Sequence, residues 1–495
     1  MNTVKRFVKN TGAAFLSQVA APSCSFILVL FIARFLGVSG LGNFSIVLSL
    51  FFIFQTVSSL GFTHLITREV ARDRSKAGKY LVNGSFIGFL FSALMAGVMC
   101  LTGYLLNYSK DTTLAIYILS FCLIPGALSL ICESICRAFE KLEYVSIAFI
   151  IGDLFKVTIG LFILFRGYGL VELVTVILGS HLLTFFLSLY FVLRLTGAPV
   201  YKIDFSFCNW IIKAIPVFAF IFIFSTLYWN VDVIMLSKMK GPIEVGFYSA
   251  AYKLMNACKM IPMAYLTAFQ PVIFRLFKTS SEKFKMACTK SIKFLFFTTL
   301  PIVVGTTILA HRFIQLFFRN AFLASANALS ILIWTLVPFS IVLVFAYALI
   351  ASNNQKIDLR VNIVGMLCNV GLNLLLIPKL GFLGASIATL ASICVFLTLQ
   401  YTFISKNLFK VDFIEATGKP LISATLMGII ILLFSRHINL LLLILISALV
   451  YVLLLVVLGT FSESDIHIFR GLWKKESGLG LSQSQSSSGY KPSSQ

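Results

Sequence analysis

Long apolar stretches separated by short polar connections run through almost the whole sequence. Each stretch is close to the roughly 20 residues that a helix needs to cross the apolar layer of a membrane. The pattern predicts an all-α membrane protein of about fourteen transmembrane helices. They lie at residues 11–33, 43–63, 83–106, 114–136, 144–165, 170–193, 211–236, 246–270, 291–310, 326–350, 359–377, 382–404, 420–435 and 439–459.

A short pattern at the end of the first predicted helix recurs in the second half of the chain. Arg34-x-x-Gly37-x4-Gly42-x-Phe44-Ser45 reappears, at one constant offset, as Lys238-x-x-Gly241-x4-Gly246-x-Tyr248-Ser249. A second, weaker repeat relates Gly169-Leu-Val to Gly381-Phe-Leu. Repeated helical bundles with binding groups between the halves are typical of secondary transporters.

The repeat predicts the organisation of the chain. We expect two pseudo-symmetric six-helix bundles at residues 1–195 and 196–404. Two additional transmembrane helices follow at 405–459, and the Ser/Gln-rich segment 460–495 is expected to be a partly disordered cytoplasmic tail.

Composition excludes several classes of protein. Of the 495 residues, 59% are hydrophobic and 12% are charged, which is more apolar side chain than a soluble core can bury. The connections between predicted helices are too short to hold a soluble domain, so the net charge of +22 does not indicate a nucleic-acid partner. The sequence has no zinc-protease motif and no phosphate-binding glycine loop. We therefore expect a transporter rather than an enzyme, without catalytic residues, metal or organic cofactor.

Loop charge predicts the orientation. With a cytoplasmic N-terminus, the cytoplasmic termini and loops hold most of the 40 Lys and Arg residues, including Arg68, Arg72, Arg275 and Lys278. Cytoplasmic loops of membrane proteins carry such an excess. We therefore expect an even number of spans and both termini in the cytoplasm.

Charged residues inside the predicted helices are the candidates for function. A charge at the centre of a bilayer costs about 2.5–3.5 kcal/mol on insertion scales, so it is retained where it faces a partner, a wet cavity or a substrate path. The predicted spans contain three lysines and three acids, namely Lys156, Lys253, Lys259, Glu133, Asp153 and Asp232.

Most of these residues also have a structural interpretation. Asp153 lies three residues before Lys156 on one helix face, and Glu133 lies four residues before Arg137, so both combinations can be ion pairs within one helix. Asp232 and Lys253 have comparable depth on a helical hairpin and can pair as well. Arg34 can extend to the interface, and Asn256 can be an interhelical hydrogen-bonding residue. Lys259 has no acidic neighbour in the sequence, which favours a functional role.

The ordered set of motifs resembles the multidrug/oligosaccharidyl-lipid/polysaccharide exporter superfamily. The set comprises Gly42-x-Phe44-Ser45, the segment from Asp232 to Ser249, Gln270-Pro271, and Asn369-x3-Asn373-x4-Pro378-x2-Gly381-x2-Gly384-Ala385. Within the superfamily, the chain is most similar to the polysaccharide (O-antigen) flippase branch, the Wzx type.

The resemblance implies a function. It implies a flippase of lipopolysaccharide biosynthesis that moves an undecaprenyl-pyrophosphate-linked oligosaccharide repeat unit from the cytoplasmic to the periplasmic leaflet by alternating access. It also implies a location in the bacterial inner membrane, and a polysaccharide polymerase and a chain-length regulator as candidate partners besides membrane lipids.

A lipid-linked glycan needs a wet cavity with cationic groups for its phosphates. The candidate substrate-binding residues are Arg34, Lys156, Lys253, Lys259 and Asn256. The candidate ion-coupling or ion-pair residues are Asp153, Asp232 and Glu133.

Two other functions remain as alternatives. In an H⁺- or Na⁺-coupled multidrug exporter of the same superfamily, the acids would bind the coupling ion, but the three lysines oppose a cationic drug. A membrane glycan polymerase is disfavoured by the short outer loops.

Overall fold

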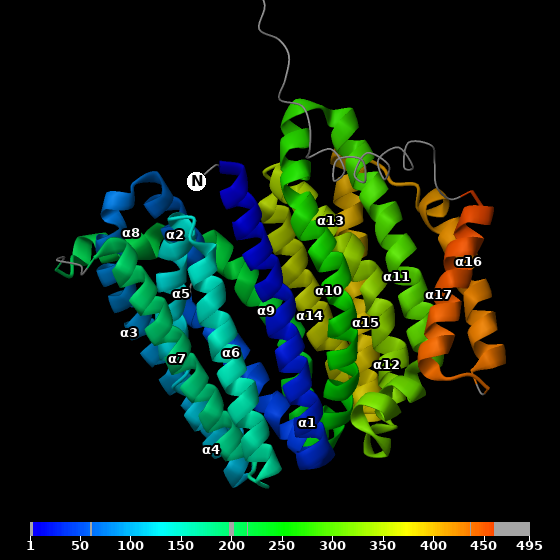
Figure 1. Ribbon diagram of the computed structural model, residues 1–495, viewed down its shortest axis with the longest axis horizontal. Coiled ribbons are helices and arrows are strands. Elements are labelled where there is room, and N and C mark those ends of the chain that lie inside the picture. Colours follow the sequence, from blue (N-terminus) through cyan, green and yellow to red (C-terminus); the bar gives the residue numbers. More distant parts are fainter. Residues whose placement is uncertain (1–2, 60–61, 198–201, 215, 436, 460–495) are drawn as a thin grey trace, which may run out of the picture. The chain divides into compact units, whose positions relative to one another are not determined.

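The computed structural model describes residues 3–59, 62–197, 202–214, 216–435 and 437–459, and every regular element in these ranges is a helix (Figure 1). The elements before residue 197 are α1 (Thr3–Ser59), α2 (Phe62–Arg72), η1 (Arg74–Lys76), α3 (Ala77–Leu105), α4 (Lys110–Ser120), α5 (Leu123–Ala138), α6 (Leu142–Phe165) and α7 (Leu170–Thr196). Those that follow, up to residue 412, are α8 (Phe205–Ala214), α9 (Pro216–Lys240), α10 (Pro242–Thr279), α11 (Ser281–Phe318), η2 (Asn320–Phe322), α12 (Ser325–Leu332), η3 (Ile333–Thr335), α13 (Leu336–Ala351), α14 (Gln355–Leu380) and α15 (Phe382–Asn407). The last two are α16 (Phe413–Phe434) and α17 (Leu440–Val457).

The predicted all-helical membrane fold is confirmed. Within the described ranges, 12 helices are long and apolar enough to cross a membrane. One of them, Cys24–Ser59, holds parts of two predicted spans, because the backbone of α1 leaves helical geometry at Gly37. α9 overlaps most of the predicted span 211–236 but is not among the 12. The predicted total of fourteen is therefore not confirmed by this count.

Two predicted helices are each broken into two shorter ones. The predicted span 114–136 is divided between α4 and α5, and 326–350 is divided between α12 and α13. Pro125 and Pro338 are the third residues of α5 and α13. A proline lacks the N–H group and clashes with the carbonyl four residues earlier, so it fits best in the first turn of a helix and favours a break before it. The two halves of the chain therefore share a second feature at corresponding places.

Two helical hairpins dock against each other. Gly37 (φ 69°) breaks α1, and Gly241 (φ 89°) separates α9 from α10, so both turns use the left-handed backbone that glycine adopts without strain. Five residues beyond each turn, the chains meet without side chains between them. A Cβ atom on Gly42 would overlap the carbonyl oxygen of Pro242, and one on Gly246 would overlap that of Val38.

This contact is reciprocal. Val38 and Pro242 are equivalent positions of the recurring pattern, as are Gly42 and Gly246. The two hairpins are therefore related by approximate two-fold symmetry, which explains why the pattern occurs twice. α1 packs against α6 before residue 197 and against α9 and α10 after it, so α1 and α10 lie at the centre of the contact between the halves.

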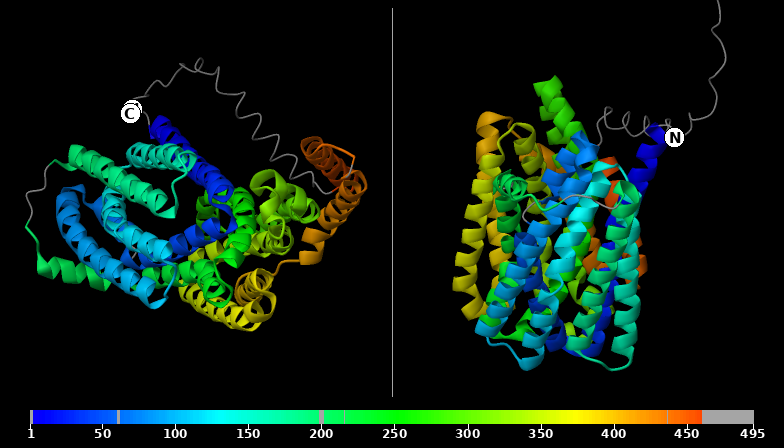
Figure 2. Two further views of the ribbon diagram at one scale, coloured as in Figure 1. Left: turned by 90° about the horizontal axis from the view of Figure 1, so that it is seen from below. Right: turned by 90° about the vertical axis from the view of Figure 1, so that its left-hand side faces the viewer.

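Residues up to Asp412 form one compact unit, and the chain from Phe413 onward forms another. In the first unit, the blue-to-teal helices gather on one side and most of the green-to-yellow helices on the other (Figure 2, left). In the second, α16 packs against α17. The predicted cytoplasmic tail, 460–495, lies outside the described residues.

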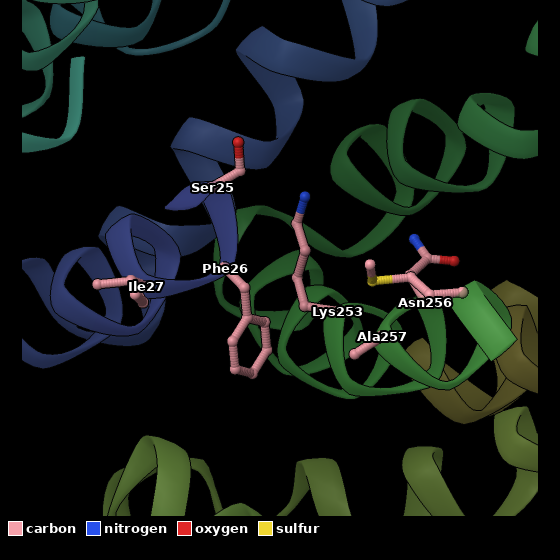
Figure 3. A pocket seen from close by; sticks show the side chains of 7 residues that line it. Ser25, Phe26, Ile27, Lys253, Asn256 and Ala257 are labelled. Carbon is pink, nitrogen blue, oxygen red and sulfur yellow. The ribbon is translucent and has the colours of Figure 1, made fainter. Parts of the chain in front are cut away.

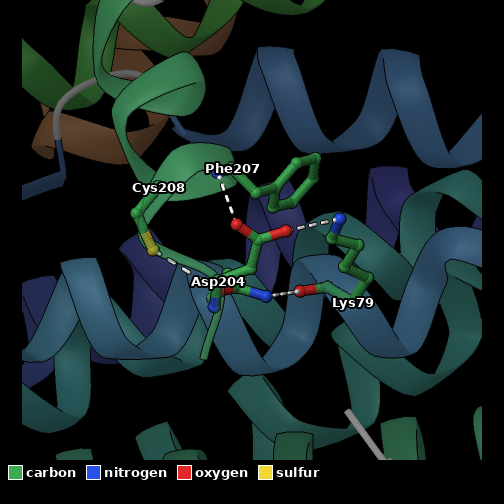
Figure 4. Close-up of polar contacts among 5 residues, drawn as sticks. Lys79, Asp204, Phe207 and Cys208 are labelled. Atoms are coloured by element: carbon green, nitrogen blue, oxygen red, sulfur yellow. Dashed lines mark hydrogen bonds and ion pairs between the residues drawn. The ribbon is translucent and has the colours of Figure 1, made fainter. Parts of the chain in front are cut away.

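The connection between the halves is fastened to α3. The Asp204 carboxylate accepts a hydrogen bond from the Phe207 N–H at 3.0 Å, which caps the start of α8, and lies 2.9 Å from Lys79 Nζ (Figure 4). Asn83 Oδ1 accepts a hydrogen bond from the Asp204 N–H at 2.7 Å. The hydrogen bond from Lys79 lowers the pKa of the Asp204 carboxyl, so this ion pair persists throughout the neutral pH range. α8 is therefore held by the first half of the chain.

We expect Gly42→Ala, and equally Gly246→Ala, to destabilise the docked hairpins, because the new Cβ overlaps a backbone carbonyl. The expected loss in the free energy of unfolding is on the order of 1–3 kcal/mol, measured as a lower melting temperature of the purified protein in detergent. Gly97→Ala is the matched control, because a Cβ there meets nothing within 4 Å. Equal melting temperatures of the Gly42→Ala and Gly97→Ala variants would contradict the contact.

Candidate functional site

A cavity of about 340 Å³ lies between α1 and α10, the helices through which the two halves meet. Its lining residues are Ser25, Phe26, Ile27, Lys253, Asn256, Ala257 and Met260. The side chains of Lys253 and Ser25 point the same way, and the Asn256 amide lies on the same stretch of α10 (Figure 3). The cavity thus combines one cationic group and two neutral hydrogen-bonding groups with apolar walls.

The structure brings two of the predicted binding residues together. Lys253 and Asn256 share a face of α10, because they are three residues apart in a helix. Lys156 lies on α6 and is not among the residues that line the cavity. Its Nζ atom is bound by the carboxylate of Asp153, as in the ion-pair interpretation of these residues. Lys253 is therefore the predicted lysine whose ammonium group faces the cavity.

Two other predicted binding residues lie away from the cavity. The ammonium group of Lys259 lies 3.6 Å from the centre of the Trp229 ring. Arg34 lies near the break in α1, where it donates a hydrogen bond to the Phe317 carbonyl oxygen at 3.5 Å. About 13 Å of helix separates Arg34 from Ser25 at the cavity. In this conformation neither residue contacts the cavity.

The helix that carries Lys259 begins earlier than predicted. The sequence predicts a span from residue 246, whereas α10 starts at Pro242, directly after the turn at Gly241. Proline favours the first position of a helix, because its ring fixes a helical φ. Lys259 therefore lies about 26 Å from the start of α10 and Lys253 about 16 Å. Lys253 is therefore nearer to the turn at Gly241 than Lys259 is.

Asp232 is the centre of a buried hydrogen-bond network. The residue is 2% exposed, and its carboxylate accepts hydrogen bonds from Asn373 at 2.6 Å, Thr389 at 2.7 Å and Tyr248 at 2.9 Å. The Asn373 amide also donates to Asn369 Oδ1 at 3.0 Å. Among the described residues, Lys253 is not a partner of Asp232, so the alternative in which they form an ion pair does not hold in this conformation.

The sequence does not identify Asn369 and Asn373 as neighbours of Asp232. As polar residues of a predicted span, they can bind glycan hydroxyls or form interhelical hydrogen bonds, and two asparagines four residues apart share one face of an apolar helix. That spacing could have identified them as one polar surface. Thr389 gave no signal, because threonine in a transmembrane helix commonly bonds its own backbone.

Glu133 is buried on α5, 2% exposed, as expected for a residue inside a span. The ion pairs seen in the described ranges do not join it to Arg137, so that part of the structural interpretation is not realised here. Within the same ranges, no group of three or more His, Cys, Asp or Glu side chains is arranged to hold a metal ion.

Comparison with known families agrees with this architecture. The model of the family described as "Polysaccharide biosynthesis protein" matches residues 7–277, which is more than half of the chain. The chain belongs to the polysaccharide biosynthesis protein family. The MatE model also matches this family member, at residues 218–375.

A curated relative of this polysaccharide biosynthesis family member is named probable flippase AglR, from Haloferax volcanii. The two are 25% identical over 212 residues, which cover 41% of this chain and 44% of the relative. The chain thus matches less than half the length of that relative.

Two solved structures share the fold of this family member. One is the lipid II flippase MurJ in an inward closed conformation, with a TM-score of 0.77, 17% identity, and coverage of 94% of this chain and 100% of that chain. The other is an inward-facing multidrug resistance MATE family transporter of the MOP superfamily, with a TM-score of 0.65, 16% identity, and coverage of 79% and 98%. Together with the family models, they confirm the predicted exporter superfamily, whereas the O-antigen branch stays a prediction. They also support the prediction of a multi-pass transporter rather than an enzyme.

The geometry predicts which buried charges are coupled. We expect Asp153→Asn and Lys156→Met to show a coupling free energy of about 0.5–3 kcal/mol in a double-mutant cycle, because the two groups are in contact. Asp232→Asn and Lys253→Met are expected to be additive within about 0.5 kcal/mol. Both cycles are measured by thermal unfolding in detergent. Coupling of Asp232 with Lys253 as strong as that of the first pair would contradict the structure.

Proposed function

We propose that this protein is a flippase that moves an undecaprenyl-pyrophosphate-linked oligosaccharide repeat unit from the cytoplasmic to the periplasmic leaflet of the bacterial inner membrane. The observation that carries the proposal is the position of Lys253 and Asn256 in a cavity between the two halves of the transporter fold. Binding sites between two repeats that rock against each other are how this class of transporter works.

The cavity suits the charged part of such a substrate. A pyrophosphate carries negative charge on oxygens that accept hydrogen bonds, and the Lys253 ammonium supplies a compact positive charge with three donors. The Asn256 amide and the Ser25 hydroxyl supply further donors. Phe26, Ile27 and Met260 offer apolar surface to the adjoining part of the prenyl chain.

Cavity size sets a limit on what is bound in this conformation. Ligand pockets range over about 300–1,000 Å³, and this one, at about 340 Å³, is at the lower end. It has room for the pyrophosphate and the groups next to it, but not for a whole repeat unit with its lipid. Transport of the complete substrate therefore requires the halves to separate further.

The docked hairpins indicate which side is closed. With the proposed cytoplasmic N-terminus, the first part of α1 runs outward to Gly37, so the turns at Gly37 and Gly241 face the periplasm. Their close contact closes the periplasmic side, and a substrate has access from the cytoplasm. Release into the periplasmic leaflet then requires the contact between Gly42 and Pro242 to open.

We further propose that a monovalent cation, H⁺ or Na⁺, binds at Asp232 and couples transport. A buried carboxylate with only neutral hydrogen-bond donors is costly inside a membrane, and a bound cation removes that cost. Asn373 Oδ1 lies beside it, is buried, and has no hydrogen-bond partner among the described residues. Carboxylate, amide and hydroxyl oxygens are the ligands that a hard cation prefers.

The direct roles predicted for Arg34 and Lys259 at the phosphates stay predictions. So do the polysaccharide polymerase and the chain-length regulator as partners, and a function in O-antigen export in particular.

We expect Lys253→Ala to reduce the rate of lipid-linked oligosaccharide translocation in proteoliposomes about tenfold or more, because hydrogen bonds to a charged group contribute about 1.5–3 kcal/mol. Lys253→Arg retains part of the rate, because the positive charge remains. Lys379→Ala is the matched control, since Lys379 is exposed and does not line the cavity. A wild-type rate in the Lys253→Ala variant, at equal protein content, would refute the proposed phosphate site.

The coupling site has a separate test. We expect Na⁺ to raise the melting temperature of the wild-type protein, and Asp232→Asn to abolish this effect. Asp358→Asn is the control, because Asp358 is another buried acid, bonded by Gln400 at 3.0 Å. If Na⁺ has no effect, a translocation rate that follows the proton gradient in the wild type and not in Asp232→Asn identifies H⁺ as the ion. Dependence on neither ion would disprove coupling at Asp232.

A further inference from the structure

The side chain of Lys259 ends inside a box of three aromatic rings. Its Nζ atom lies 3.6 Å from the ring centre of Trp229, 4.7 Å from that of Phe339 and 5.6 Å from that of Tyr252. All three distances fall within the ~6 Å over which a ring face attracts a cation. The rings come from α9, α13 and α10, and Lys259 is only 6% exposed. We call this arrangement of Trp229, Phe339 and Tyr252 the aromatic box.

The aromatic box is held together by contacts that do not involve the lysine. The rings of Trp229 and Phe339 meet edge to face, with their centres 5.7 Å apart. The Tyr252 hydroxyl donates to the Trp229 carbonyl oxygen at 3.4 Å, and its ring stacks on Tyr248. Edge-to-face and stacked pairs of this kind stabilise a fixed ring geometry. The box is therefore expected to persist when the Lys259 side chain is removed.

A box of aromatic faces is a recognition site for ammonium ligands. Proteins bind quaternary ammonium groups and methylated lysines in such sites, because each ring face presents negative potential and the ligand sheds little water. In this protein the aromatic box is filled by the ammonium group of Lys259. Because Lys259 belongs to the same chain, its effective concentration at the box is high.

We propose that Lys259 is a tethered cation that fills a latent binding site for organic ammonium ions, and that by filling it Lys259 excludes such ions from the protein. Lys259 then determines which ligands the protein accepts. The protein has the fold of multidrug exporters, but its site for organic cations is filled by its own lysine side chain. This inference does not rest on the proposed flippase activity, because ligand binding can be measured without transport.

The test uses n-butylammonium, which resembles the end of a lysine side chain. Isothermal titration calorimetry on the purified full-length Lys259→Ala variant should show binding at least about tenfold tighter than in the wild type. Neutral n-butanol should not bind comparably, because it lacks the charge that the rings attract. Equal affinity of the wild type and the variant for n-butylammonium would overturn the proposal.

Two further variants test whether a gain in affinity comes from binding in the aromatic box or from the loss of any positive charge. Lys253→Ala removes a lysine from the same helix without opening the box, so it should not gain affinity. Lys259→Ala with Trp229→Ala should lose the gained affinity, because the nearest ring is gone. A gain in Lys253→Ala equal to that in Lys259→Ala, or binding that survives the loss of Trp229, would show that the box is not the site.

The proposal stays testable if Lys259→Ala yields little folded protein. In that case n-butylammonium, present from solubilisation onward, should increase the yield of monodisperse protein and raise its melting temperature. The same concentration of n-butanol should do neither. An unchanged yield and melting temperature with the amine would count against the aromatic box as a site for ammonium ions.

Discussion

The close approach of two backbones at Gly42 and Gly246 is the constraint on which the rest of the first unit depends. Because neither position has room for a Cβ atom, the start of α10 lies directly against the second part of α1. That approach fixes the register of α1 on α10, and with it which side chains meet further along. Ser25 and Lys253 face one cavity because their helices are set by this contact. The glycine pattern is repeated because both hairpins need a glycine at the same position of a two-fold interface.

The charged residues within the predicted spans determine which side chains surround them. Three charges within the helices are satisfied in different ways: Lys156 by Asp153, Asp232 by three neutral donors, and Lys259 by aromatic rings. Lys253 differs because its charge is directed into a cavity. A charge within an apolar helix bundle that has no described ion-pair partner has to be stabilised by water or by a ligand. A binding residue therefore differs from a structural one in what compensates its charge. The presence of a lysine alone does not distinguish them.

The sequence was informative wherever the signal is local. Apolar length predicts the spans, and the pattern around Gly37 and Gly241 predicts the two halves. The breaks before Pro125 and Pro338 were missed, because mean hydropathy does not change at a helix break. The surroundings of Lys259 could not be predicted, because Trp229 and Phe339 lie on other helices. The partners of Asp232 come from α10, α14 and α15, and only the folded chain places them together.

The candidate coupling site and the docked hairpins are joined through one helix. Tyr248, which bonds Asp232, follows Gly246 by two residues on α10, and Lys253 lies on the same helix. A helix transmits displacement along its axis, because its backbone hydrogen bonds resist stretching. Under the proposed mechanism, a change in what occupies Asp232 would act on α10, which bonds Asp232 through Tyr248 and also carries the cavity lysine. Coupling between an ion and a substrate requires a shared element with two arrangements, and α10 is the part of this structure that both sites have in common.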